Sequence, residues 1–173
     1  MHSVLEFSDE ISTVLRLANG VLEDPVKNRP VVTTPAEGRT ISLVGDIYRF
    51  LVVGEETGGR YALFEATVPP GGGPPPHRHS REEEGFYVLE GEVTVQVDDQ
   101  HFVAGIGTFA NMPVGSLHCF KNESGKPASM LIFVAPAGLE KMFLEVGQGV
   151  VPGTRPLPPS REEIEKLLAV APQ

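Results

Sequence analysis

The sequence predicts an all-β domain of the barrel or sandwich class, followed by short helices. Its 173 residues include 19 glycines and 16 prolines, about a fifth of the chain where average usage is about 12%. Strand patterns recur at short intervals from Thr40 to Ala135, with no helical pattern between them. A chain of this length buries enough surface to fold without disulfides or a structural metal. Any bound metal is therefore expected to serve function, and the metal-free protein is expected to stay folded.

Three regions follow from the pattern along the chain. Residues 1–38 carry turn signals such as Asn19-Gly20 and Asp24-Pro25 and are expected to form an arm with weak local structure. Residues 39–137 are expected to form the β domain. Residues 138–173 are expected to form a helical extension that packs on it.

The strands of the β domain are recognised by composition and by alternation. The segments ISLVGDIYRFLVVG and RYALFEATVP are rich in β-branched and aromatic residues. Val93, Val95 and Val97 alternate with polar residues in a period of two, which is typical of a half-buried strand. The strand MLIFV is apolar on both faces, so one face needs a cover from a helix, the N-terminal arm or a second subunit. We therefore expect a homodimer.

Two short helices are predicted in the extension. Leu139, Met142, Phe143 and Val146 have the spacing of one helical stripe, which Gly147 can terminate. The sequence Ser160-Arg161-Glu162-Glu163 has the form of a capping box and precedes a second apolar stripe.

Charge and composition exclude several classes of partner. The net charge of −9 argues against nucleic acid, whose binding needs clustered Lys and Arg. No apolar run reaches the length of a membrane span, and acidic residues interrupt the first ten positions where a signal peptide would be apolar. With Cys119 as its one cysteine the chain has no internal disulfide, which fits a reducing compartment. We expect a cytoplasmic protein that binds neither nucleic acid nor membrane.

Histidines and a glutamate suggest a metal site. His77 and His79 are two residues apart, so in extended chain both rings point to the same side. Pro74–Pro76 stiffen the approach to this pair. Glu84 shares strand parity with Phe86 and Val88, which would shield it from water if it faces inward. Taken alone, the pair is more simply interpreted as two solvated histidines.

Two longer patterns resemble the metal motifs of the cupin superfamily. GGGPPPHRHSREEEGFYVLEG matches G(X)5HXH(X)3,4E(X)6G, and GTFANMPVGSLHCFKN matches G(X)5PXG(X)2H(X)3N, without a departure at a defining position. The motif residues are Gly71, His77, His79, Glu84 and Gly91 in the first, and Gly107, Pro113, Gly115, His118 and Asn122 in the second. The resemblance implies a double-stranded β-helix, or jelly-roll barrel, with a metal bound inside by His77, His79, Glu84 and His118.

Three imidazoles and one carboxylate suit a divalent transition metal and leave up to two octahedral positions open. The ligand set accepts Fe, Mn, Ni, Co, Cu or Zn, so the identity of the metal stays open. Cys119 is expected on the opposite strand face from His118, and His2 and His101 on the surface. Glu82 and Glu83 are expected to be solvated or paired with Arg78 or Arg81. Six further residues are candidates for barrel core or pocket wall: Tyr61, Phe64, Phe109, Phe120, Met130 and Phe133.

A second, less specific resemblance concerns activity. The glycine-rich approach to His77 and the tail Pro136–Phe143 look like quercetin dioxygenase-like cupins, over roughly residues 30 to 150. That resemblance implies oxygen-dependent cleavage of a small flavonol or related enol, with Glu84 as ligand and catalytic base. Two alternatives remain: a non-catalytic cupin that binds a metal or small molecule, and an isomerase or lyase that uses the metal as a Lewis acid.

Overall fold

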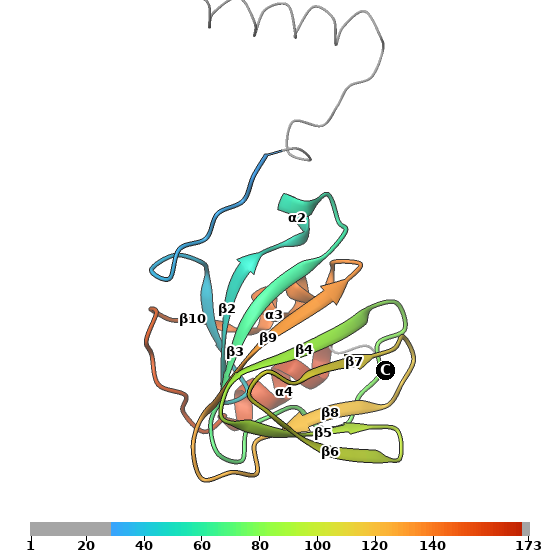
Figure 1. Ribbon diagram of the computed structural model, residues 1–173. Coiled ribbons are helices and arrows are strands. Elements are labelled where there is room, and N and C mark those ends of the chain that lie inside the picture. Colours follow the sequence, from blue (N-terminus) through green and yellow to red (C-terminus); the bar gives the residue numbers. More distant parts are fainter. Residues whose placement is uncertain (1–28, 171–173) are drawn as a thin grey trace, which may run out of the picture. The chain divides into compact units, whose positions relative to one another are not determined.

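The structure, a computed structural model, describes residues 29–170 (Figure 1). Most of the expected N-terminal arm, with His2, lies outside the described residues. The chain divides into two units, residues 1–30 and 31–173, and every element below belongs to the second. The strands are β1 (Thr40–Leu43), β2 (Asp46–Val52), β3 (Ala62–Val68), β4 (Glu83–Glu90), β5 (Glu92–Val97), β6 (Gln100–Gly105), β7 (Phe109–Met112), β8 (His118–Lys121), β9 (Ala128–Ala135) and β10 (Gln148–Gly149). The helices are α2 (Gly54–Thr57), α3 (Leu139–Val146) and α4 (Arg161–Val170).

The strands form two antiparallel sheets, which confirms the predicted all-β jelly roll. The larger sheet has the order β10-β1-β2-β3-β9-β4-β7, and the smaller has the order β6-β5-β8. Gly91, with φ of 70°, makes the tight turn from β4 to β5. A left-handed conformation of this kind strains any residue with a β-carbon, and here an added Cβ would also lie 2.8 Å from the carbonyl oxygen of Pro127.

The core lies on one face of the larger sheet. Phe64 on β3 and Phe86 on β4 both pair with Ile132 on the central strand β9, so the three side chains share a face. All three are buried. Phe86 meets Phe120 of the smaller sheet edge-on, with ring centroids 5.3 Å apart, and this contact joins the two sheets.

Helix α3 packs on the same inner face, over the half that the smaller sheet leaves open. Its Phe143 lies 5.5 Å from the ring of Phe64 and 5.0 Å from that of Tyr48. The predicted helix over residues 139–146 is thus confirmed, and in Figure 1 it lies behind β2, β3 and β9. The predicted capping box is confirmed as well, because Ser160 Oγ accepts the N–H of Glu163 and the N–H of Ser160 donates to the Glu163 carboxylate.

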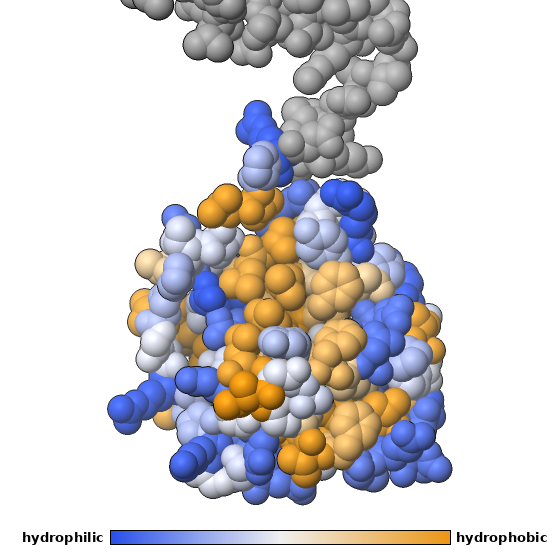
Figure 2. Space-filling view, in the orientation of Figure 1, coloured by the Kyte–Doolittle hydropathy of each residue, from blue (hydrophilic) through white to orange (hydrophobic). Residues whose placement is uncertain are grey.

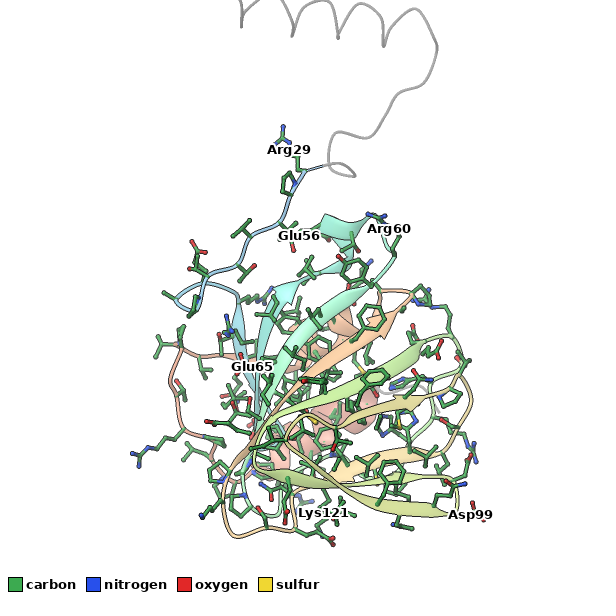
Figure 3. The ribbon with its side chains drawn as sticks, in the orientation of Figure 1. Arg29, Glu56, Arg60, Glu65, Asp99 and Lys121 are labelled. Carbon is green, nitrogen blue, oxygen red and sulfur yellow. The ribbon has the colours of Figure 1, made fainter. Side chains whose placement is uncertain are left out.

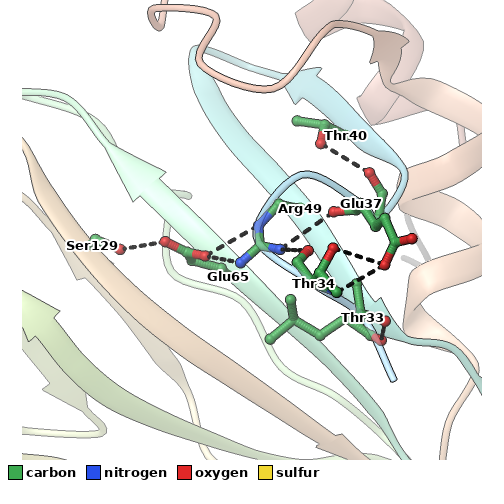
Figure 4. A network of polar contacts seen from close by, with 9 residues as sticks. Thr33, Thr34, Glu37, Thr40, Arg49, Glu65 and Ser129 are labelled. Atoms are coloured by element: carbon green, nitrogen blue, oxygen red, sulfur yellow. Dashed lines mark hydrogen bonds and ion pairs between the residues drawn. The ribbon is translucent and has the colours of Figure 1, made fainter. Parts of the chain in front are cut away.

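A polar network covers the outer face of the larger sheet at β2 and β3 (Figure 4). Arg49 donates to the Glu65 carboxylate at 2.7 Å and also to the carbonyl oxygens of Thr34 and Glu37. Ser129 donates to the other oxygen of Glu65. Residues 33–38 are thereby fastened along this part of the sheet, and Glu65 is visible on it in Figure 3.

Beside this network the outer face is apolar, as Figure 2 shows. We call it the outer apolar face; it consists of Tyr61, Leu63, Tyr87, Phe109, Leu131 and Phe133. Phe109 is 61% exposed and Phe133 is 41% exposed. These two residues are therefore not pocket walls, whereas Phe64, Phe120 and Met130 are buried as expected.

Within residues 29–170, no helix has the length and apolar character that crossing a membrane requires.

Candidate metal centre

Three segments that are distant in the sequence bring the predicted ligands together. His77 and His79 lie between β3 and β4, Glu84 lies in β4, and His118 begins β8. One possible ligand atom from each of the four residues lies within 4.8 Å of the others. The imidazole centroids are 4.6 to 5.2 Å apart. All four predicted site residues therefore face one point.

Backbone hydrogen bonds hold these segments in register. His77 and His118 exchange two bonds, each 2.9 Å from N–H to carbonyl oxygen. The N–H of Gly115 donates to the carbonyl oxygen of His79. Gly115 has φ of 82° in the turn closed by Ser116 N–H and the Pro113 carbonyl, so the predicted type II-like turn is present.

Carbonyl oxygens orient two of the imidazole rings. Nδ1 of His77 lies 3.0 Å from the carbonyl oxygen of Pro75, and Nδ1 of His118 lies 3.1 Å from that of Ser116. A carbonyl oxygen only accepts, so Nδ1 carries the hydrogen in both rings and Nε2 keeps its lone pair in the neutral form. This is how proteins prepare a histidine to bind a metal. The sequence did not predict that the Ser116 carbonyl orients the ring of His118. Strand parity gives the direction of side chains but not their hydrogen bonds to nearby backbone atoms.

Glu84 is buried among the histidines. Its Oε2 lies 3.1 Å from Nε2 of His118 and 3.6 Å from Nε2 of His79. Burial raises the pKa of Glu84, but the hydrogen bonds and charges of the two histidines outweigh burial, and the net shift is downward. Glu84 is therefore a carboxylate at neutral pH, and its contact with a ring nitrogen is favourable when a cation, either a proton or a metal ion, lies between them.

The net pKa shifts of His77 and His79 have opposite directions, although burial lowers both. Burial lowers the pKa of His77, which favours the neutral ring. Burial also opposes the charged form of His79, but the hydrogen bond and charge of Glu84, together with Glu82, raise the pKa of His79 on balance. Nε2 of His79 is buried and has no full hydrogen-bond partner by geometry, since its contact with Glu84 is long.

That unpartnered nitrogen shows how the site fits a metal. A buried polar atom without a partner is costly, and a cation at the centre of the cluster would satisfy it. Three imidazoles with one carboxylate form a donor set suited to divalent transition metals. The cluster could therefore hold such a metal.

The remaining candidates lie away from the cluster. Cys119 contacts Gln96 on the other face of β8, as predicted from parity, and His101 is exposed on β6. Glu82 pairs with Arg81 at 2.8 Å, which confirms one of the expected pairings. Glu83 is exposed, as the solvated alternative predicted, and accepts a hydrogen bond from Asn111.

One buried polar pair was missed. Asp46 and Tyr48 lie on the inner face of β2 and are 2% and 5% exposed. The sequence did contain an indication of this pair, because both residues have the strand parity of the core residues of β2. A carboxylate is rarely found at such an inward position unless it has a specific partner.

Comparison with known proteins relates the β domain to a known family. Residues 64–134 match the family model described as Cupin domain. The chain is 24% identical over 139 residues to quercetin 2,3-dioxygenase of Bacillus subtilis, which covers 80% of this chain and 41% of that protein. It is 31% identical over 74 residues to the uncharacterized protein MJ1618 of Methanocaldococcus jannaschii, covering 43% of this chain and 59% of that protein. The chain thus spans less than two thirds of the length of either relative.

A solved structure has the same fold. An RmlC-like cupin from Shewanella frigidimarina superposes with a TM-score of 0.58 at 17% identity, over 66% of this chain and 98% of that one. The fold and the cluster define a jelly-roll barrel of the cupin type with a candidate metal centre. Residues 64–134 are a cupin domain by this match, and the chain resembles quercetin 2,3-dioxygenase.

Proposed function

We propose that the protein is a metal-dependent dioxygenase that acts on a small aromatic enol, of flavonol-like chemistry, inside the barrel. The observation that carries the proposal is the convergence of His77, His79, Glu84 and His118 on one point, with His79 Nε2 unpartnered. The likeness to a quercetin dioxygenase over 80% of this chain supports the reaction type.

The four side chains would hold a divalent transition metal of the series Fe, Mn, Ni, Co, Cu and Zn. When bound, such a metal supplies Lewis acidity toward an enolate oxygen and a site for oxygen chemistry. The donor set differs from a closed structural zinc site, which usually includes thiolates.

Glu84 has the position of a catalytic base as well as of a ligand. Its lowered pKa keeps it ionised, and Oε2 is shared with two histidines, which leaves its other oxygen to accept a proton from an enol. Phe86 and Phe120 are buried in the same interior. These apolar rings exclude water, which strengthens electrostatic interactions there.

Two other functions fit the same cluster. One is a non-catalytic cupin that binds a metal or small molecule, and the other is an isomerase or lyase that uses the metal as a Lewis acid. All three share the fold, so the reaction separates them.

Oxygen uptake with flavonols and aromatic enediols tests the proposal. The metal-loaded wild type is expected to consume oxygen, and Glu84→Gln, which keeps an oxygen donor but removes the base, is expected to be slower by about 100-fold or more. The measurement is oxygen-electrode kinetics, with metal content determined on the same samples.

The outcomes distinguish the three functions. Substrate conversion without oxygen uptake would favour the isomerase or lyase. Retention of metal without turnover across the panel would favour the binding protein.

We also propose a homodimer that forms through the outer apolar face. At a net charge of −9, two copies repel each other, so an interface needs a surface free of unpaired charge. The outer apolar face comes close to this condition. The neighbouring Arg49 and Glu65 are paired with each other, and the Glu83 carboxylate at its edge accepts a hydrogen bond from Asn111. A contiguous apolar patch of this kind is typical of an interaction site.

Replacing Phe133 by Glu is expected to convert the dimer to monomer, because a buried unpaired carboxylate opposes association. Light scattering coupled to gel filtration measures the mass. Val103→Glu is the control, since Val103 is 65% exposed on β6, outside this face. A wild type that is monomeric at high concentration would contradict the proposal.

For location, we propose the cytoplasm, on the ground that Cys119 is a free thiol.

A further inference from the structure

Asp46 and Tyr48 form a buried polar pair at the side of the barrel interior. The hydroxyl of Tyr48 donates to Oδ2 of Asp46 at 3.2 Å. Oδ1 of Asp46 is buried and has no full hydrogen-bond partner. A buried carboxyl with a free oxygen is costly, and the proposed reaction does not use it.

The free oxygen faces the segment that leads to the histidines. We call residues 69–76 the glycine loop. A Cβ placed on Gly72 would lie 2.6 Å from Oδ1 of Asp46, so glycine is needed for the two to approach. The amide of Gly73 is also directed at this carboxyl, although its geometry falls short of a full hydrogen bond.

The glycine loop is hydrogen-bonded to Asn122, the residue that follows β8. Gly71 N–H donates to the Asn122 carbonyl at 2.7 Å, and Asn122 N–H donates to the Gly72 carbonyl at 3.0 Å. Five residues after Gly72, His77 and His118 exchange their two bonds in an isolated antiparallel bridge. We call the bonds of Gly71 and Gly72 with Asn122, together with the His77–His118 bridge, the ladder. Asp46 therefore touches one end of the ladder, at Gly72, and the contact of His77 with His118 forms the other end.

We propose that Asp46 and Tyr48 are positioning residues, which hold the glycine loop against β8 and so keep His77 and His79 in the geometry that binds the metal. This inference rests on the proposed metal site. The pair acts through backbone, since neither residue is among the ligands.

The protonation state of Asp46 makes the positioning of the glycine loop depend on pH. Burial raises the pKa of Asp46 to about 7, while the hydrogen bond from Tyr48 and the Gly73 amide oppose the rise. Burial and the charges of Asp46 and Glu84 raise the pKa of Tyr48 well above its ordinary range, so Tyr48 stays a donor. Above pH 7 the pair would contain an unsolvated carboxylate, which loosens the loop.

Other charged groups around the pair are engaged elsewhere or absent. The glycine loop and residues 157–159, which flank Gly45, carry no titratable side chain. On α3, which packs on Tyr48, Glu140 accepts the amides of Gly54 and Gly138, and Lys141 and Glu145 are exposed.

Amide hydrogen exchange of the metal-free protein tests the proposal. Protection factors are measured by NMR for the ladder amides of Gly71, His77, His118 and Asn122, on both sides of pH 7. In the wild type, protection is expected to fall as the pH rises through about 7. Asp46→Asn is expected to stay protected without this transition, and Asp46→Ala is expected to lose about tenfold in protection at every pH.

Two further variants separate positioning from general stability. Tyr48→Phe removes a bond that favours the charged carboxyl, so its transition is expected at higher pH than in the wild type. Thr57→Val is the matched control. It removes the buried hydrogen bonds of Thr57 to the Gly54 and Tyr61 carbonyls, away from the loop, and is expected to leave the ladder transition unchanged.

Titration with Co²⁺ completes the experiment. Asp46→Ala is expected to bind Co²⁺ about tenfold more weakly than the wild type, and Asp46→Asn is expected to bind normally. Equal amide protection and equal Co²⁺ affinity in the wild type and Asp46→Ala would overturn the positioning role but not the proposed metal site. A pH transition in protection that persists in Asp46→Asn would have the same consequence. A wild type that binds no Co²⁺ would overturn the proposed function and this inference together.

Discussion

Replacing His118 by Ala is expected to lower metal affinity by at least about 100-fold, more than the loss of an outer-shell contact causes. The variant removes one of four donors. It also leaves the buried Glu84 carboxylate with only the longer contact to His79, at 3.6 Å. Metal content after purification without chelators, followed by titration of the metal-free protein, measures the effect.

His101→Ala is the control for this variant, because His101 is an exposed histidine on β6 outside the cluster. It should retain metal as the wild type does. Equal metal content in His118→Ala and the wild type would rule out the assigned site. Circular dichroism of the metal-free wild type is expected to show the folded state, since the core does not depend on the metal.

Replacing Asp46 by Asn is expected to change how stability depends on pH. The pKa of Asp46 is about 7 in the folded protein against 3.8 for an ordinary carboxyl. Between these values the folded state binds more protons than the unfolded state, so the free energy of unfolding falls as the pH rises. A difference of about three pKa units corresponds to about 4 kcal/mol, present below pH 4 and lost above pH 7.

Asn does not titrate, so the free energy of unfolding of Asp46→Asn does not fall with pH for this reason. Relative to Asp46→Asn, the wild type is expected to lose up to about 4 kcal/mol between pH 4 and pH 8. Urea unfolding of both metal-free proteins across the pH range measures the difference, and the contribution of the histidine cluster cancels between them. Parallel curves would show that Asp46 does not titrate in this window.

Local pattern predicted much of the fold and of the candidate site. The parity of Glu84 with Phe86 and Val88 placed all three on one face, and all three are buried. The stripe at residues 139–146 and the capping box at Ser160 also predicted helices that the structure contains. These features depend on neighbours within a few residues, and side-chain direction at that range follows from backbone geometry alone.

Other features depend on strands that meet from distant parts of the chain. Phe109 and Phe133 are large apolar residues of the kind expected in a core. They lie on the outer apolar face because the pairing of β4 with β7 and β9 turns them outward. Asp46 lies beside Gly72 because β2 and the glycine loop meet in the folded protein. Strand parity does not predict contacts between segments that are distant in the sequence. It indicates which residues of a strand share a face, but not which part of the chain covers that face.

The sequence by itself determined the fold class, the four candidate ligands and the turns that present them. Local geometry predicts a barrel or sandwich and the turns, whereas the jelly roll and the set of four ligands are what the resemblance of the motif spacings to the cupins implies. Only the tertiary structure decided that the four side chains meet within 4.8 Å, that His79 Nε2 lacks a partner, and that Asp46 braces the loop before His77. The reason is that the packing of strands far apart in the sequence sets the distances between side chains and their desolvation. The spacing of residues along the chain does not determine that packing.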